Sequence, residues 1–73
     1  WIFADIDFDD DSHVVAVYDK AIEMERRTRD HFKERAEASR PGPEREIYRE
    51  LAAEEEDHVA ILENEREQFA GDD

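Results

Sequence analysis

The sequence predicts an all-α fold, an antiparallel hairpin of two long helices that dimerises into a four-helix bundle. Two long stretches, one on each side of a short turn, contain no glycine or proline, and strong helix formers dominate both. In each stretch the apolar residues recur at alternating spacings of three and four, the period of one helix face. Because two helices in a chain of 73 residues cover only one side of each other, we expect a second copy to cover the rest.

The first helix is expected to run from about Ser12 to about Ala38, with Ser12 or Asp11 as its N-cap. The side of the helix that carries most of the apolar residues also carries one glutamate. This stripe consists of Val14, Tyr18, Ala21, Glu25, Thr28 and Phe32, widened by Val15, Ile22 and Ala36. The opposite side is mostly charged, so we expect it to face solvent.

The sequence Pro41-Gly42-Pro43 predicts the turn between the helices. Proline disfavours helical backbone at the residue before it and is well tolerated as the first residue of a helix. The second helix is therefore expected from about Glu44 to about Phe69, with Gly71 marking its end. Its stripe consists of Tyr48, Leu51, Glu55, His58, Leu62, Glu65 and Phe69, flanked by Ile47 and Ile61.

Two parts of the chain are predicted, an arm over residues 1–11 and the helical hairpin over residues 12–70. The arm mixes aromatic residues with aspartates and has no helical period. We expect it to be extended and to dock on a partner or on the bundle surface. Its alternating aspartates resemble the start of an EF-hand loop, but Asp10 stands where that loop needs glycine and Ala16 where it needs a glutamate.

The composition excludes several classes of protein. A formal net charge of -13 argues against binding to nucleic acid or to an anionic membrane. The chain has no cysteine, which excludes disulfides and thiolate metal sites. No apolar run approaches the roughly 20 residues of a membrane span. We therefore expect a cytoplasmic protein, or one held inside a protein compartment.

Glu25, Glu55 and His58 interrupt the apolar stripes and are the candidate ligands of a metal site. The midpoint of Glu25 and Glu55 falls at residue 40, in the turn region, so an antiparallel hairpin places both at one level. His58 follows Glu55 by one helical turn on the same face. A carboxylate on a core face is costly unless it is paired. A two-fold dimer would offer four carboxylates and two imidazoles, a set that suits two iron or manganese ions.

Each of these residues taken alone also has an ordinary interpretation. Glu25 could lie at the edge of a narrow stripe, and Glu55 belongs to an acidic run of the kind that is usually solvated. A single histidine on an apolar face, such as His58, is more often a core residue than a ligand. The match of all three at one level favours the metal site. The neighbouring Glu54 and Asp57 either guide cations inward or are solvated, and we expect the latter.

The residues resemble those of a known family. Glu25 followed by Phe32, together with Glu55-x-x-His58, resembles the pattern of ferritin-like di-iron proteins. The strings around both glutamates are similar to rubrerythrin-type domains. The two-helix extent resembles the encapsulated ferritins, whose hairpins dimerise to complete the di-iron site. The resemblance covers about residues 14–69 and implies that Glu25, Glu55 and His58 ligate iron, with manganese as an alternative metal. Phe32 stands where many of these proteins have a tyrosine near the metal.

The resemblance implies a ferroxidase, which oxidises Fe(II) with oxygen or peroxide for iron storage or detoxification. Glu25, Glu55 and His58 would be its catalytic residues, with Glu55 as the bridging ligand, Glu25 as a terminal or bridging ligand and His58 as a terminal nitrogen ligand. The expected partners are a second copy of the chain and either an encapsulating shell or an electron-donor protein. Two alternatives remain open. One is a rubrerythrin-like domain that scavenges peroxide with electrons from a separate donor, and the other is a non-catalytic helical interaction module.

Overall fold

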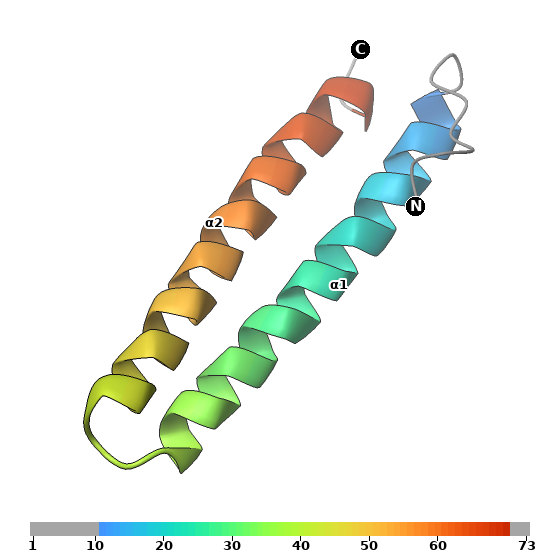
Figure 1. Ribbon diagram of the computed structural model, residues 1–73. Helices are drawn as coiled ribbons and strands as arrows, with labels where there is room; N and C mark the ends of the chain where they lie inside the picture. The colour runs from blue at the N-terminus through green and yellow to red at the C-terminus, as the bar shows by residue number, and fades with distance from the viewer. Residues whose placement is uncertain (1–10, 71–73) are drawn as a thin grey trace.

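The computed structural model describes residues 11–70, which form two α-helices joined by a short turn (Figure 1). Helix α1 runs over Asp11–Ala38 and helix α2 over Pro43–Ala70. The helices lie side by side and antiparallel, so the start of α1 and the end of α2 lie at the same end of the molecule (Figure 1). Neither helix contains an apolar stretch long enough to cross a membrane.

The all-α hairpin predicted from the sequence is confirmed, and every predicted helix end lies within one residue of the observed one. The predicted boundary of the arm was wrong by one residue, because Asp11 is already the first residue of α1. The rest of the predicted arm, residues 1–10, lies outside the described residues.

Gly42 and Arg45 close the turn between the helices. Gly42 has a φ of +146°, which residues with a Cβ rarely adopt. Pro43 then opens α2, where its missing N–H removes no helical hydrogen bond. The Arg45 Nε donates to the carbonyl oxygens of Ala36 and Ser39, each at 3.1 Å. The first turn of α2 therefore caps the last turn of α1, whose carbonyl groups have no partner within the helix.

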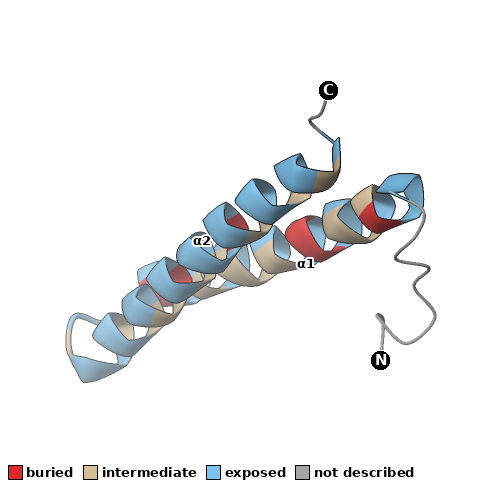
Figure 2. Cartoon of the chain, turned by 90° about the horizontal axis from the view of Figure 1, so that it is seen from above, coloured by how far each residue is buried: buried red, intermediate tan, exposed pale blue. Residues whose placement is uncertain are grey.

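The buried core consists of small apolar side chains along the line where the helices meet. Its members are Val14, Ala21, Ile22, Ala36, Ala52 and Val59. Figure 2 shows buried positions where the helices face each other and exposed positions over most of their outer surfaces. The larger members of the predicted stripes, Tyr18, Phe32, Tyr48, Leu51, Leu62 and Phe69, are only half-buried. The prediction for the second stripe was partly wrong: its members His58 and Glu65 and the flanking Ile47 and Ile61 are exposed, and the buried residues of α2, Ala52 and Val59, lie beside that stripe. The hairpin alone thus covers its small apolar residues and leaves its large ones partly open to solvent.

The molecule is elongated. Its radius of gyration is 15.4 Å, whereas a compact domain of this length would have about 11 Å. Two helices in a single layer cannot enclose a core, because each buries only the strip that faces the other. The half-buried aromatic and leucine side chains are a consequence of this shape.

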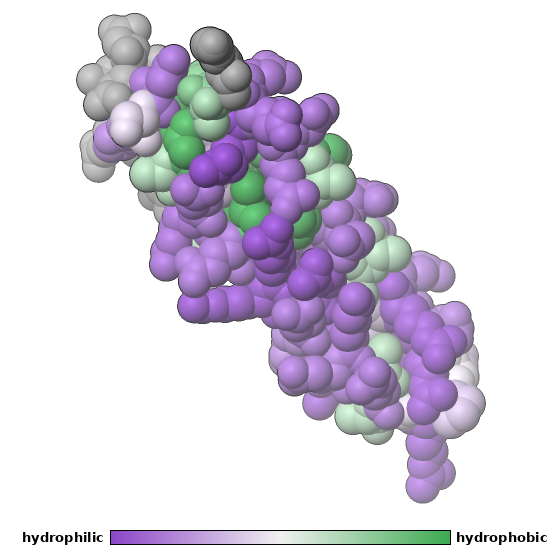
Figure 3. Space-filling view, turned by 180° about the vertical axis from the view of Figure 1, so that it is seen from behind, coloured by the Kyte–Doolittle hydropathy of each residue, from purple (hydrophilic) through white to green (hydrophobic). Residues whose placement is uncertain are grey.

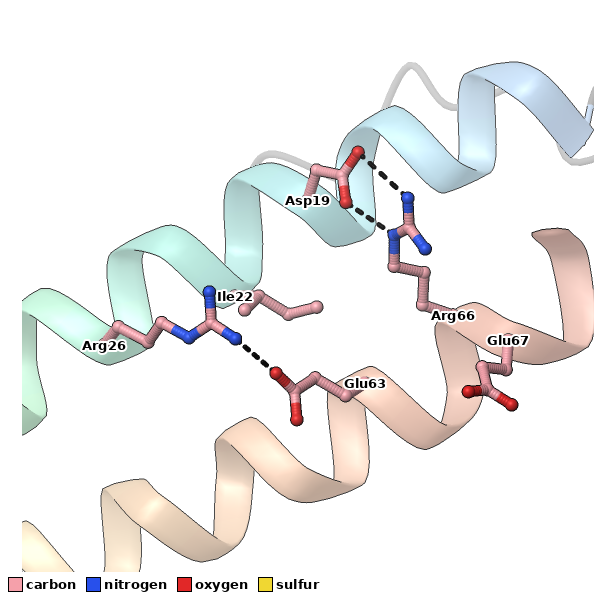
Figure 4. Close-up of a pocket in the computed structure, with 6 residues that line it drawn as sticks. All are labelled: Asp19, Ile22, Arg26, Glu63, Arg66 and Glu67. Carbon is pink, nitrogen blue, oxygen red and sulfur yellow. Dashed lines mark hydrogen bonds and ion pairs between the residues drawn. The ribbon is translucent and has the colours of Figure 1, made fainter. Parts of the chain in front are cut away.

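Three arginine–carboxylate pairs connect the two helices: Asp19–Arg66, Arg26–Glu63 and Arg29–Glu56. The first two pairs lie on either side of Ile22 (Figure 4). With Ile22 they line a groove of about 380 Å³. In Figure 3, hydrophilic side chains cover most of the face seen from behind, with hydrophobic ones in the gaps between them. Exposed pairs of this kind contribute at most about 1 kcal/mol each, so their main effect is to favour one register of the helices.

Candidate metal centre

Glu25 of α1 and the pair Glu55 and His58 of α2 converge on one point between the helices. One ligand atom from each residue lies within 4.8 Å of the others. The Nδ1 atom of His58 lies 3.3 Å from Oε1 of Glu55 and 3.6 Å from Oε1 of Glu25. The three residues therefore converge at one level, as their distances from the turn predicted, but His58, which was predicted on the core face, is exposed. The role of the residues as ligands stays a prediction.

The cluster is covered by protein on one side and open on the other. The Glu55 side chain is 18% exposed, that of Glu25 is 35% exposed, and that of His58 is 53% exposed. The carboxylates therefore lie at the edge of the contact between the helices, and the imidazole lies outside it. An ion bound here would have room for further ligands on the open side.

The charges of the cluster shift two of its pKa values in the same direction. The pKa of Glu25 is raised, first by its hydrogen bond with Glu55, then by burial and by the Glu55 charge. The pKa of His58 is also raised, first by its hydrogen bond with Glu55, while partial desolvation opposes the shift. Both groups thus hold a proton more tightly than usual. The cluster carries excess negative charge, and any bound cation would relieve it.

The donor set fits a transition metal ion. Ligand atoms that bind one ion at about 2.1 Å and at right angles lie about 3.0 Å apart, and the two histidine–carboxylate distances of 3.3 Å and 3.6 Å are close to this value. Two carboxylate oxygens and one imidazole nitrogen suit iron, manganese or zinc better than magnesium or calcium, which prefer oxygen ligands alone.

The other acidic and imidazole side chains singled out in the sequence lie apart from this centre. Glu54 and Asp57 are exposed, as expected for solvated residues. His13 and His31 are also exposed, and His31 lies against the ring of Phe32 at 6.0 Å between centroids. Within residues 11–70, only the three predicted residues form a group that could hold a metal.

The ion pair between Arg29 and Glu56 was not predicted from the sequence. Arg29 lies one helical turn after Glu25, and Glu56 directly follows Glu55. The Nη1 atom of Arg29 lies 3.0 Å from Oε1 of Glu56, so the pair joins the helices beside the cluster. Residues equally far from the turn lie opposite each other, and the midpoint of Arg29 and Glu56 also falls in the turn. The same reasoning that brought Glu25 opposite Glu55 could therefore have predicted this pair. An arginine on a charged helix face gives no further sign of its partner.

Comparisons with protein-family models, curated proteins and solved structures find no match for this chain. A two-helix hairpin by itself does not identify the ferritin-like superfamily, because many unrelated proteins contain one. The resemblance described above therefore remains a prediction from the residues. The geometry of Glu25, Glu55 and His58 is the feature of this chain that bears on its function.

Proposed function

We propose that this chain is a ferritin-like di-iron carboxylate protein that oxidises Fe(II) with oxygen or peroxide, for iron storage or detoxification. The metal site would be completed where two copies of the hairpin meet. One observation carries the proposal: two carboxylates and an imidazole from different helices converge within 4.8 Å. Without a metal ion, only His58 would offset the charge of the two carboxylates at the edge of the helix contact.

The exposed side of the cluster supports the participation of a second copy. His58 and Glu25 are partly open to solvent, and half-buried apolar side chains, among them Leu51 and Leu62, occur along the same stripes. Covering this surface with a second hairpin would bury those side chains and bring two clusters together. Four carboxylates and two imidazoles would then surround two ions, in the manner of helix bundles whose facing helices supply the ligands.

The side chains have distinct roles in this scheme, in which Fe(II) is the substrate and loses one electron to the oxidant. Glu25 and Glu55 supply negative charge, which favours the more highly charged Fe(III) product over Fe(II). The Nδ1 atom of His58 faces both carboxylates and would supply the nitrogen ligand. The open side would admit the oxidant and release the product.

Metal titration of ligand variants tests the proposal. Glu25→Gln, Glu55→Gln and His58→Asn should each weaken anaerobic binding of Fe(II) and of Co(II), a spectroscopic substitute, by at least about ten-fold. Glu54→Gln is the matched control, because it removes an exposed carboxylate next to Glu55 and should leave binding within about two-fold of wild type. The rate of oxygen consumption after addition of Fe(II) should likewise fall in the three ligand variants and stay close to that of wild type in Glu54→Gln.

Two results would contradict the proposal. The first is the absence of saturable Fe(II) or Co(II) binding, which would reduce the cluster to an ion pair between an imidazolium and two carboxylates. The second is equal loss of binding in Glu54→Gln and Glu55→Gln, which would indicate diffuse attraction of cations to an acidic surface. Rapid consumption of peroxide by the Fe(II)-loaded protein with an added electron donor would favour the peroxide-scavenging alternative.

A further inference from the structure

Tyr18 forms a hydrogen bond across the helix contact that the metal centre does not use. Its hydroxyl group donates to Oε1 of Glu65 over 3.1 Å, and the two residues belong to different helices. The Tyr18 ring stacks on that of Phe69, with 5.7 Å between centroids and 27° between planes. The stacking restricts the ring, and the phenolic O–H points at a carboxylate that can accept its proton.

The chain has only one other tyrosine, and its surroundings are the opposite. The guanidinium carbon of Arg35 lies 5.5 Å from the centroid of the Tyr48 ring. A positive charge over an aromatic face is attracted to its electrons, so removal of an electron from that ring is disfavoured. The Tyr48 side chain hydrogen-bonds with that of Arg35, a cation that cannot take the phenolic proton.

This contrast matters because the oxidation of a phenol releases a proton. The pKa of Tyr18 is raised above its ordinary value, first by burial and then by the hydrogen bond and charge of Glu65, so the phenol is protonated near neutral pH. Losing an electron alone would leave an unfavourable phenol cation. A base within hydrogen-bond distance removes this obstacle by taking the proton as the electron leaves.

We propose that Tyr18 and Glu65 form a redox pair that captures one-electron oxidants. Tyr18 gives one electron to the oxidant, its phenolic O–H bond breaks, and a new O–H bond forms on the Glu65 carboxylate. The products are a neutral tyrosyl radical, a protonated Glu65 and an oxidant reduced by one electron. A further Fe(II) ion restores the pair, since its electron and the proton held by Glu65 regenerate the phenol and leave Fe(III).

The position of the pair connects it to the metal centre. Tyr18 precedes Glu25 by seven residues and Glu65 follows His58 by seven, which places both about 10 Å along the helices from the cluster. Oxidants of the required class form when Fe(II) reduces peroxide. This use of the pair rests on the proposed function, whereas the redox chemistry of Tyr18 and Glu65 belongs to the metal-free chain and can be tested there.

Photo-oxidation of metal-free, full-length variants tests the pair. A photogenerated ruthenium(III) polypyridyl complex serves as the one-electron oxidant, and Trp1→Phe removes the one tryptophan from every variant. Tyr48→Phe leaves Tyr18 as the only tyrosine, and Tyr18→Phe leaves Tyr48. Transient absorption of the tyrosyl radical gives the rate of its formation. The Tyr18 protein should form it at least about ten times faster than the Tyr48 protein.

Glu65→Gln, added to the variant with Tyr18 alone, should abolish that advantage, because the amide keeps a hydrogen-bond acceptor but cannot take the proton. Glu67→Gln is the matched control for net charge, since Glu67 is exposed on α2, and it should leave the rate unchanged. Equal rates of radical formation at Tyr18 and Tyr48 would contradict the proposed redox pair. So would a rate at Tyr18 that Glu65→Gln leaves unchanged. If the radical forms rapidly at Tyr18 and its rate depends on Glu65, but the protein binds no iron, the redox pair stands and only the proposed function is contradicted.

Discussion

At the scale of single residues, the molecule places two carboxylates where they repel each other and adds one imidazole beside them. Glu55 raises the pKa of Glu25 through a hydrogen bond and through its charge, and both carboxylates raise the pKa of His58. A proton bound to Glu25 or to His58 reduces the repulsion within the cluster, which is why both pKa values are raised in the metal-free chain. A metal ion would take over that role, and its binding would release any proton held there.

The raised pKa of His58 predicts a pH dependence of stability in the metal-free chain. Imidazolium at position 58 stabilises the fold below its unfolded pKa of about 6.5, and this contribution is lost as the pH rises through the higher folded pKa. The pKa of Glu25 is also raised, so its protonated form likewise stabilises the fold, and this contribution is lost as the pH rises through the acidic range. The thermal midpoint, followed by circular dichroism, should therefore fall from about pH 6 to about pH 8.

A comparison of histidine variants separates this effect from the general repulsion of a chain with a net charge of -13. His58→Asn should make the thermal midpoint less dependent on pH. His31→Asn replaces an exposed histidine that touches Phe32 and no carboxylate of the cluster, and it should keep the wild-type slope. Identical slopes in all three proteins would contradict the assigned electrostatics of His58.

At the scale of the elements, the turn fixes which residues of the two helices face each other. Gly42 combines a positive φ with open space around its α-carbon, since an added Cβ would meet no atom within 4 Å. Any cost of replacing it is therefore conformational and not steric. Arg45 adds the hydrogen bonds that tie the start of α2 to the end of α1.

Gly42→Ala should destabilise the hairpin by about 1 to 2 kcal/mol, because alanine must adopt a φ that its Cβ disfavours. Arg40→Ala, at an exposed position of the same turn, should change the stability by less than about 0.5 kcal/mol. Urea unfolding at one fixed protein concentration measures both, since association would otherwise alter the midpoint. An unchanged midpoint in Gly42→Ala would mean that the turn has no need of this glycine.

The two helices, the turn between them and the meeting of Glu25 with Glu55 and His58 could be predicted from the sequence alone. Proline and glycine at positions 41 to 43 mark the turn unambiguously, and equal distances from it bring Glu25 opposite Glu55. The depth of burial could not be predicted in the same way. Spacing identifies the face on which Phe32 and Leu62 lie, but coverage of that face depends on a neighbour, and one antiparallel helix covers each of these side chains only in part.

At the scale of the whole molecule, an elongated pair of helices carries a strong negative charge and an incompletely covered apolar stripe. Two such hairpins repel each other at long range and attract through their apolar side chains at short range. Cations bound between them would reduce the repulsion at the contact. We therefore expect the metal site and the association of two copies to depend on each other.

The most direct test of this account is a crystal structure of the iron-loaded protein with anomalous scattering measured at the iron edge. The account predicts two iron peaks about 3.5 to 4 Å apart between two hairpins related by a two-fold axis. Glu25, Glu55 and His58 of both copies should be the protein ligands. Iron peaks elsewhere, or none, with these three side chains in contact only with one another or with solvent, would contradict it.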